Sequence, residues 1–429
     1  MDTICAISTA YGSGGIAVIR ISGPQAIETA ERLTGTTLRR QVNYRRVNDL
    51  DDMVLTVFRA PHSFTGEDTV EISVHGSLYI QQEVIRRLTT LGCRCAQAGE
   101  FTKRSFLNGK MDLAQAEAVA DLIAAETQAE KDLALAQLRG SVSSELQSLR
   151  DRLLHLTSLL ELELDFADHE ELEFADRSEL KQLADEIENK LSQLIDSFQS
   201  GNAIKNGIPV AIIGPTNAGK STLLNALLGE ERAIVSNIAG TTRDTVEDRL
   251  IIDGILFRLI DTAGLRETND SIEQLGIQRS HEAIRQARII IQVAESEDEL
   301  LPLAETQSKT VIRVLNKCDL HPHIPVHGRD ICCISARNND LNDLKSRLTE
   351  HVRSNTHNGV MISNARHYDA LNRALDAIRR VKTGLQNGLS GELTSMDLQD
   401  CLNALGEITG QITNTEVLSN IFSKFCIGK

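Results

Sequence analysis

The residues best suited to chemistry lie between 214 and 221, where the chain reads GPTNAGKS. This octet fits G-x-x-x-x-G-K-[ST], the glycine-rich loop that cradles phosphates. The apolar segment Val210–Ile213 precedes it and the apolar run 222–228 follows, which predicts strand, loop and helix in that order. The loop amides and the helix N-terminus then point at phosphate, Lys220 adds positive charge, and Ser221 offers a hydroxyl to Mg²⁺. The pattern predicts a nucleotide site rather than a chance match.

Two later motifs select the base. NKCD, at 316–319, follows the apolar segment 311–315, and SAR, at 335–337, follows the segment 331–334. A fixed carboxylate such as Asp319 accepts hydrogen bonds from the ring N–H and the amino group of guanine, a donor pair that adenine lacks. The pair of motifs therefore predicts GTP.

Two further motifs face the γ-phosphate. DTAG, at 261–264, follows the apolar segment 255–260, so its carboxylate suits Mg²⁺ through water and its glycine amide suits the phosphate. AGTTRD, at 239–244, holds two threonines that compete to complete the Mg²⁺ shell. Leu265 stands where many small GTPases carry a catalytic Gln, and an apolar side chain cannot orient water. Hydrolysis therefore needs another polarising group and another positive charge.

The elements that position these motifs divide the chain of 429 residues into roughly three domains. Residues 1–111 predict an α+β domain, with strands at 3–7, 16–21, 53–58 and 70–74 and a helix at 78–91. The glycine-rich loop 10–15 loosely suggests a dinucleotide fingerprint. It leads into a strand instead of a helix, so the dinucleotide interpretation fails.

Helical periodicity occupies two other parts of the chain. Asp112 and Gln115 have capping-box spacing, and leucines follow at intervals of three and four to residue 194. The pattern breaks near Gly140 and at the acidic segment 165–177, where a solvated loop is favoured over a metal cluster. Segments 200–207 and 354–359 have linker composition. Because helices flank it on both sides, the P-loop domain is predicted to be inserted into a helical domain.

The composition limits the kinds of partner that the chain can bind directly. The formal net charge is −15, aromatic residues make up 3% and Trp is absent, which argues against stacking platforms for nucleic acid. Any RNA must then be held by a local basic patch or by a partner. The eight cysteines form no C-x-x-C and no zinc spacing, and no apolar run reaches membrane length. These features predict a cytoplasmic chain with reduced thiols and no membrane partner.

The motifs together resemble the family of tRNA-modification GTPases called MnmE or TrmE. The segments that carry the resemblance are RISG (20–23), FTGED (64–68), FLNGK (106–110), NAGKS (217–221), GTTRD (240–244), Leu265 and FCIGK (425–429). The resemblance implies an α/β and α protein. A folate-binding, dimerising N-terminal domain (1–111) precedes a helical domain (112–206 and 356–429) with an inserted Ras-like G domain (207–355). VAES, at 293–296, departs from the family's usual V-D-x-[ST].

The resemblance also implies a potassium-stimulated mechanism. K⁺ would lie on Asn217, Ser236, Ile238 and Thr241, and Mg²⁺ on Ser221 and Thr242. Glu273 would orient the attacking water, although from the residues alone it is only a helix carboxylate. The complete set of expected GTP contacts is Asn217, Ala218, Gly219, Lys220, Ser221, Thr222, Ser236, Asn237, Ile238, Ala239, Gly240, Thr241, Thr242, Asp261, Thr262, Ala263, Gly264, Asn316, Lys317, Cys318, Asp319, Ser335, Ala336 and Arg337.

A second implied site binds folate, as 5,10-methylene- or 5-formyl-tetrahydrofolate. The matching residues are Arg20, Glu71, Lys110 and Lys429. Cations suit folate's carboxylates and a glutamate suits the pterin's N–H donors, whereas the residues alone would equally make ordinary surface charge. Cys426 is either a reactive thiol near the folate or a buried structural thiol, and both interpretations stay open.

The implied function is GTP hydrolysis in the modification of the wobble uridine of certain tRNAs. A homodimer would assemble with the FAD-dependent protein MnmG (GidA) as a heterotetramer. It would add an aminomethyl-type group, such as carboxymethylaminomethyl, at uridine C5. One alternative is a regulatory GTPase of ribosome assembly, which would be expected to carry a basic domain. Another is a membrane-remodelling GTPase, but the apolar seams lack a basic face.

Overall fold

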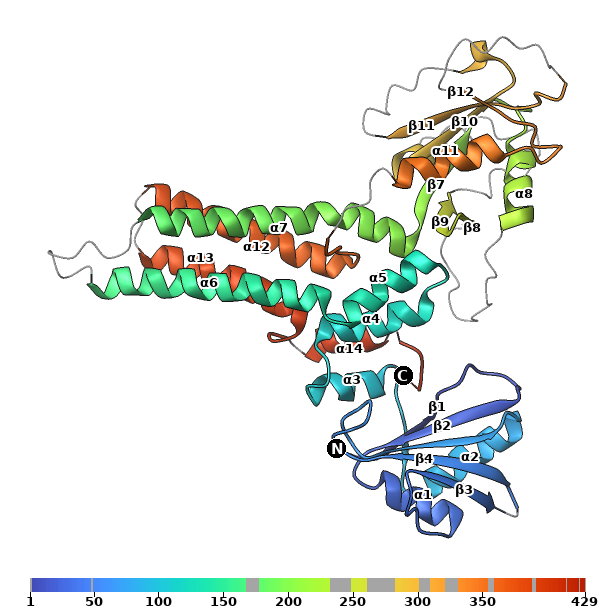
Figure 1. The fold of residues 1–429 in the computed structure, drawn as a ribbon, viewed down its shortest axis with the longest axis vertical. Coiled ribbons are helices and arrows are strands. Elements are labelled where there is room, and N and C mark those ends of the chain that lie inside the picture. Colours follow the sequence, from blue (N-terminus) through green and yellow to red (C-terminus); the bar gives the residue numbers. More distant parts are fainter. Residues whose placement is uncertain are drawn as a thin grey trace. The chain divides into compact units, whose positions relative to one another are not determined.

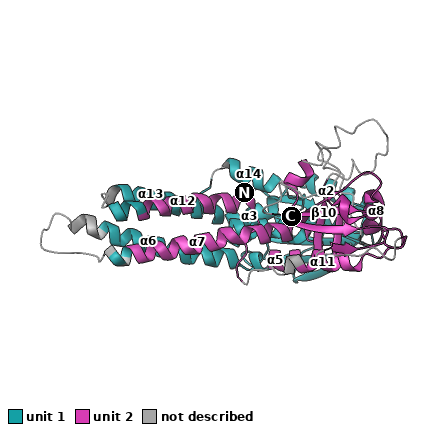
Figure 2. Cartoon of the chain, turned by 90° about the horizontal axis from the view of Figure 1, so that it is seen from above, with its two compact units in different colours: residues 1–123, 136–180, 383–429 teal, residues 124–135, 181–382 magenta. Residues whose placement is uncertain are grey.

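The computed structural model describes the chain except for residues 1, 48, 167–176, 232–247, 261–281, 301–308, 321–330, 354–358, 388–390, 414, 424 and 429. Figure 1 shows the elements and Figure 2 the two compact units that they form. One unit comprises 1–123, 136–180 and 383–429, and the other comprises 124–135 and 181–382. No helix within the described residues is long and apolar enough to cross a membrane.

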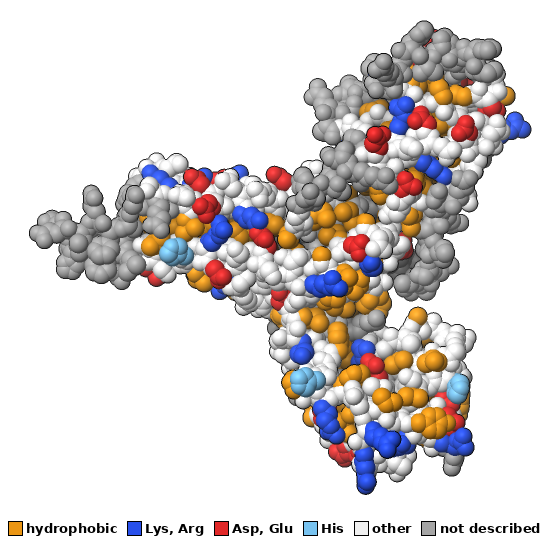
Figure 3. All heavy atoms as spheres, viewed as in Figure 1, with side chains coloured by type: hydrophobic (Ala, Val, Ile, Leu, Met, Phe, Trp, Pro, Cys, Tyr) orange, Lys and Arg blue, Asp and Glu red, His pale blue; other side chains and the backbone are white. Residues whose placement is uncertain are grey.

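The first unit contains a six-stranded sheet in the order β3-β4-β5-β2-β1-β6, antiparallel except for the β1–β6 pair. Its strands are β1 (Ile4–Ile7), β2 (Ile16–Ser22), β3 (Val42–Val47), β4 (Asp51–Phe58), β5 (Thr69–His75) and β6 (Arg94–Cys95). Side chains alternate between the faces of a strand. One face packs on α1 (Ala26–Thr34) and α2 (Leu78–Thr90). The other meets Phe101 of α3 (Glu100–Leu107). Figure 3 shows Lys and Arg side chains on the surface of this part.

Beyond α1, α2 and α3, the first unit includes the helices α4 (Leu113–Ala124), α6 (Ser141–Phe166), α13 (Gly391–Thr409) and α14 (Thr415–Ser423). The predicted capping box is confirmed, because Gln115 N donates to Asp112 Oδ1 at 2.8 Å and Asp112 N donates to Gln115 Oε1 at 3.0 Å. The predicted break is also present at Gly140, whose φ is +88°. The α6 leucines at 146, 149, 153, 156 and 160 are buried, as helical spacing requires.

The second unit contains the other sheet, in the order β12-β11-β10-β7-β9-β8. Its strands are β7 (Ile208–Ile213), β8 (Asp248–Ile252), β9 (Ile255–Leu259), β10 (Ile289–Ala294), β11 (Thr310–Leu315) and β12 (Ile331–Cys333). All pairs are parallel except β8–β9. The helices α8 (Lys220–Glu231) and α11 (Asn342–Arg353) contribute to the main core of this sheet. In parallel sheets of this kind, ligands bind at the carboxyl ends of the strands.

Three further helices contribute to the second unit: α5 (Gln128–Leu138), α7 (Arg177–Asn206) and α12 (Ala365–Asn387). The prediction of a linker at 200–207 is wrong, because α7 continues to Asn206 and β7 begins at Ile208. The glycine that suggested a linker has another role. A Cβ on Gly201 would lie 2.3 Å from the carbonyl oxygen of Ile362, so glycine permits close packing of that segment on the helix.

Candidate functional site

The P-loop joins the end of β7 to the start of α8, as predicted. Three of its residues have positive φ: Gly214 (+152°), Asn217 (+68°) and Gly219 (+89°). A Cβ on Gly214 would lie 2.0 Å from Val293 O, and a Cβ on Gly219 would lie 2.2 Å from Asn316 Nδ2. No side chain fits in either place, so the glycines let the loop approach β10 and the segment after β11.

Lys220 begins α8 and turns back over the loop. Its Nζ donates to the carbonyl oxygens of Gly214 at 2.9 Å and Pro215 at 2.6 Å. Burial lowers the pKa of this ammonium, because desolvation disfavours its charge. A phosphate placed among the loop amides would return a charge partner to Lys220 and satisfy it better than neutral carbonyls do. The side chain therefore fits an anionic ligand.

The remaining loop residues differ in exposure. Asn217 is exposed, Ala218 is buried, Ser221 is half-buried in the first turn of α8 and Thr222 is exposed. Leu223 N donates to Gly219 O at 2.9 Å, so the helix begins directly at the loop. A hydroxyl in the first helical turn is an oxygen ligand, the kind of ligand that Mg²⁺ prefers beside a nucleotide.

Asn316 ties three motifs together. Only 2% of this residue is exposed, and it lies directly after β11. Its Nδ2 donates to Ala218 O in the P-loop at 3.0 Å, and its Oδ1 accepts from Ala336 N in the SAR motif at 3.1 Å. Both polar atoms of this buried amide therefore have a hydrogen-bond partner. The phosphate and base segments are fixed relative to each other by this one residue.

The Asp319 carboxylate, which is predicted to read the base, is accessible and held in place. Asp319 is exposed, and its Oδ1 accepts from Ser335 Oγ at 2.8 Å. Ser335 is buried within a turn in which Asp340 N donates to Ser335 O at 3.1 Å. Arg337 is exposed next to it, so the SAR motif offers its backbone, not this side chain, to a ligand. Asp319 is thus a fixed acceptor, as guanine recognition requires.

The middle of the NKCD motif is also anchored. Lys317 has a φ of +63°, and its Nζ pairs with Glu295, which follows β10. Cys318 N donates to Ile334 O at 3.2 Å. The pKa of the Cys318 thiol is raised to about 11 by burial and by Cys333 beside it, so this half-buried residue stays protonated near neutral pH.

In the N-terminal sheet, Arg20 and Glu71 are directly opposite each other on β2 and β5. Arg20 donates from Nε at 2.9 Å and from Nη2 at 2.7 Å to Glu71 Oε1. The Arg20 guanidinium lies 5.6 Å from the ring centroids of both Phe64 and Phe101. The structure therefore brings two of the predicted folate residues together beside aromatic rings, on the sheet face away from α1 and α2.

Lys110 packs against residues 61–66, the loop that also carries Phe64. Its Nζ donates to Pro61 O at 3.1 Å, and a Cβ on Gly66 would lie 3.2 Å from its Cγ. Lys110 is exposed, so its ammonium is accessible to an anion. The structure gives no direct contact between Lys110 and Arg20 among the described residues.

The C-terminal segment is bound to the N-terminal sheet. Ile427 forms an antiparallel bridge with Ala98, and Ser8 Oγ donates to Gly428 O at 3.1 Å. A Cβ on Gly428 would lie 2.1 Å from Ile7 O, so only glycine fits against β1. Cys426 is exposed, because the segment packs through Phe425 and Gly428. The interpretation of Cys426 as a buried structural thiol is therefore wrong.

Comparison with known proteins agrees with this arrangement. Residues 3–110 match the family model "GTP-binding protein TrmE N-terminus", and residues 113–426 match "MnmE helical domain". The tRNA modification GTPase MnmE of Parabacteroides distasonis is 52% identical over 461 residues, which cover 100% of both chains. The MnmE proteins of Bacteroides thetaiotaomicron and Flavobacterium psychrophilum are 49% and 48% identical, over 100% of this chain and 99% of theirs.

The chain belongs to the MnmE family of tRNA modification GTPases.

Membership in the MnmE family makes the chain a GTP hydrolase and confirms the predicted fold class. The match to the helical domain runs from 113 to 426 across the nucleotide sheet, as expected for a P-loop domain inserted between helical parts. The α+β domain precedes it, as predicted. The similarity extends over the full length of the MnmE relatives, so no part of the chain lies outside the comparison.

Several residues to which the family resemblance assigns a role lie outside the described part of the chain. They are the loop residues 236–242, the DTAG segment 261–264, Leu265, Glu273 and Lys429. The described residues nevertheless hold the P-loop, NKCD and SAR segments in contact with one another. The predicted roles of the other residues stay predictions.

Sequence reasoning missed two groups that support the sites. Glu295 belongs to the VAES departure from the MnmE pattern, and the structure makes it the ion-pair partner of Lys317. In the N-terminal domain, Arg104 is 3% exposed and pairs with Glu67, which also accepts from Ser22 Oγ at 2.8 Å. This network holds the FTGED loop that carries Phe64 to Arg20. The charged motif FTGED was the one sequence signal for this network. Its partner Arg104 could not be identified, because it stands at no recognisable spacing from the motif.

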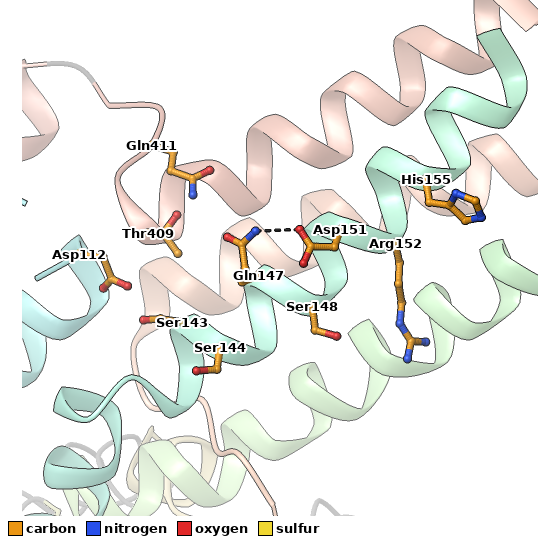
Figure 4. A pocket seen from close by; sticks show the side chains of 10 residues that line it. All are labelled: Asp112, Ser143, Ser144, Gln147, Ser148, Asp151, Arg152, His155, Thr409 and Gln411. Carbon is orange, nitrogen blue, oxygen red and sulfur yellow. Dashed lines mark hydrogen bonds between the residues drawn. The ribbon is translucent and has the colours of Figure 1, made fainter. Parts of the chain in front are cut away.

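One open cavity of about 800 Å³ lies in the helical part of the first unit (Figure 4). It is lined by Asp112, Ser143, Ser144, Gln147, Ser148, Asp151, Arg152, His155, Thr409 and Gln411. Gln147 Nε2 donates to Asp151 Oδ1 at 2.8 Å along α6. None of its lining residues belongs to the predicted GTP, metal or folate sets, so the cavity is separate from these sites.

Proposed function

We propose that the chain is a potassium-dependent GTP hydrolase that acts in modifying the wobble uridine of certain tRNAs. The observation that carries the proposal is the position of Asn316, which joins the phosphate loop to the base-reading segment in a chain similar to MnmE over its full length. Complementation tests it. In a bacterium that lacks its own family member, this chain should restore the C5 modification of wobble uridine, measured by mass spectrometry of tRNA nucleosides. Unmodified uridine in the complemented strain would contradict the proposal.

The proposed nucleotide domain is 207–355, between helical parts 112–206 and 356–429. Mg²⁺ would be held by the hydroxyls of Ser221 and Thr242. The described part of this set fits, because Ser221 lies in the first helical turn next to Lys220. Bound there, the cation would neutralise charge on the β- and γ-phosphates. Lys220 would exchange its two carbonyl acceptors for phosphate oxygens.

K⁺ would be held by the side chain of Asn217 and by oxygens of Ser236, Ile238 and Thr241. The exposed, left-handed Asn217 fits this role, because its side chain is free to turn toward a ligand outside the loop. The cation would supply the positive charge that other GTPases obtain from arginine, and Glu273 would orient water in place of Leu265. The expected signature is hydrolysis that is fast in KCl and slow in NaCl.

Residues 1–111 are the proposed folate-binding and dimerising domain, with Arg20, Glu71, Lys110 and Lys429 at the site. The described residues fit, since the Arg20–Glu71 ion pair, the accessible ammonium of Lys110 and aromatic rings suit a pterin with an acidic tail. Arg20 orients Glu71 and would stay beside it in the complex. Arg20→Ala should abolish binding of 5-formyl-tetrahydrofolate in calorimetric titration. Equal binding by wild type and variant would exclude Arg20 from the site.

The proposed partners rest on the similarity to the MnmE family. The homodimer would act on tRNA together with the FAD-dependent MnmG protein in a heterotetramer, in the cytoplasm. 5,10-methylene-tetrahydrofolate would supply the carbon for the aminomethyl group at uridine C5. Cys426 is exposed on the segment bound to β1, where its thiol is accessible to substrate. Its proposed role is catalytic, at or near the folate.

A further inference from the structure

We propose that one corner of the N-terminal domain binds the phosphate backbone of the tRNA substrate. This arginine corner consists of Arg39, Arg40, Arg45 and Arg59. The proposal rests on the proposed function, because it assumes that tRNA is the substrate. The chain has a formal net charge of −15, so its long-range field repels RNA. Contact with phosphate therefore requires a local surface on which cations outnumber carboxylates.

The strand register brings the corner together from distant parts of the chain. Strands β3 and β4 are antiparallel, with Val42 opposite Thr56. The ladder continues one step further, since Val57 N donates to Gln41 O at 2.8 Å. The next residues outward are Arg40 and Arg39 on one side and Phe58 and Arg59 on the other. Arg39, Arg40 and Arg59 are all exposed at this end of the hairpin.

Arg45 adds a fixed charge to the corner. Its guanidinium donates to Thr36 Oγ1 at 2.8 Å, Tyr44 O at 2.7 Å, Thr37 O at 3.3 Å and Asn43 Oδ1 at 3.4 Å. All four acceptors are uncharged, so the bonds orient the side chain without neutralising it. The same Asn43 donates from Nδ2 to the carbonyl oxygen of Arg40 at 2.6 Å and is buried. Arg45 and Arg40 are thus linked through one buried amide.

The acids of the hairpin lie at its opposite end and are paired there. Asp52 pairs with Arg46, Asp51 with His75, and Asp49 with Arg87. Within the described residues, Arg39, Arg40 and Arg59 have no carboxylate partner. Two carboxylates border the corner, and each accepts a backbone amide: Glu31 from Leu38 and Asp68 from Ala60, at 2.8 and 2.9 Å. Charge is therefore separated along the hairpin, with its acids at one end and Arg39, Arg40 and Arg59 at the other, while Arg45, opposite Met53, lies between them.

The corner adjoins the proposed folate site. His62 N donates to Arg59 O at 2.7 Å, which closes a turn through Pro61. Lys110, one of the proposed folate residues, donates to the carbonyl oxygen of that same Pro61 at 3.1 Å. A strand of RNA bound along the corner would therefore pass close to the cation proposed to hold folate. This arrangement would bring a nucleotide of the RNA near the one-carbon donor.

The test compares tRNA binding by the full chain and by the Arg39→Ala/Arg40→Ala double variant, measured by fluorescence anisotropy at several KCl concentrations. The variant should bind about tenfold more weakly, and its slope of log affinity against log salt should be shallower by about 1 to 2, since each phosphate that is no longer neutralised removes about one unit. Its GTP hydrolysis without tRNA should be unchanged. The charge-preserving Arg39→Lys/Arg40→Lys variant should retain binding and so separate charge from folding.

Arg86→Ala is the matched control, because Arg86 is an exposed arginine of the same domain that is already paired with Glu83. This control should bind tRNA like wild type. Equal affinity and equal salt slope for wild type and the Arg39→Ala/Arg40→Ala variant would overturn the assignment of the corner. If the wild type itself fails to bind tRNA, the proposed function is contradicted along with the corner.

Discussion

Replacing Asp319 by Asn is expected to lower the affinity for GTP by about 100-fold or more. The Asp319 carboxylate is fixed by Ser335 Oγ at 2.8 Å and is exposed to the base. In Asn, an NH₂ group replaces one of the two carboxylate oxygens. This NH₂ then faces an N–H donor of guanine, so one hydrogen bond is lost and a repulsive contact replaces it. Xanthine carries a carbonyl in place of the amino group, so Asp319→Asn should bind xanthosine triphosphate better than wild type does. Equilibrium titration with both nucleotides measures the change.

Asp340→Asn is the matched control for Asp319→Asn. Asp340 is an exposed aspartate of the same turn, and it contacts Ser335 through backbone atoms. The control should retain guanine preference because no backbone atom changes. An unaltered preference for GTP in Asp319→Asn would show that this carboxylate does not read the base.

Gly219→Ala is expected to lower nucleotide affinity by about 100-fold. The φ of +89° strains any residue with a Cβ, and that Cβ would lie 2.2 Å from Asn316 Nδ2. Asn316 must then move and lose its bonds to Ala218 and Ala336. The strain and the unsatisfied buried amide cost roughly 2 to 5 kcal/mol together. Affinity for GDP and the rate of GTP hydrolysis both report the loss.

Gly229→Ala controls for the change of glycine to alanine. Gly229 lies in α8, and a Cβ there meets nothing within 4 Å. Alanine in a helix is more stable than glycine by about 1 kcal/mol, so this variant should bind nucleotide normally and melt slightly higher. If both variants bind alike, the close approach of Gly219 to Asn316 has no importance for the site.

The nucleotide site was the part most accessible to prediction, because the P-loop, DTAG, NKCD and SAR motifs each follow a segment of apolar residues. Those strands appear where the pattern expected them. The connection through Asn316 was not predictable, since its partners lie 98 and 20 residues away and depend on how the parallel strands are ordered. The linker at 200–207 was predicted wrongly, because composition does not distinguish a flexible glycine from Gly201, which packs closely inside a helix.

The N-terminal domain was predicted less completely. Its hydrophobic strands were found, but β3 was not, because its VNYRRV sequence is largely polar and exposed at an edge of the sheet. The short helix α1 was also missed. The pairing of Arg20 with Glu71 depends on a register between strands 51 residues apart, so only the family resemblance placed them in one site. The exposure of Cys426 depends in the same way on how the C-terminal segment docks.

The measurement that tests the central claim most directly is the rate of GTP hydrolysis in KCl and in NaCl at equal ionic strength, for wild type and for Asn217→Ala. The proposed mechanism predicts a wild-type rate at least about tenfold higher in KCl. Asn217→Ala should be slow in both salts and should still bind GTP, because Lys220, Ser221 and Asn316 are intact. Thr216→Ala, which alters another exposed residue of the loop that belongs to no predicted contact set, should keep the preference for KCl. Equal wild-type rates in the two salts would contradict the potassium mechanism and with it the role of Asn217.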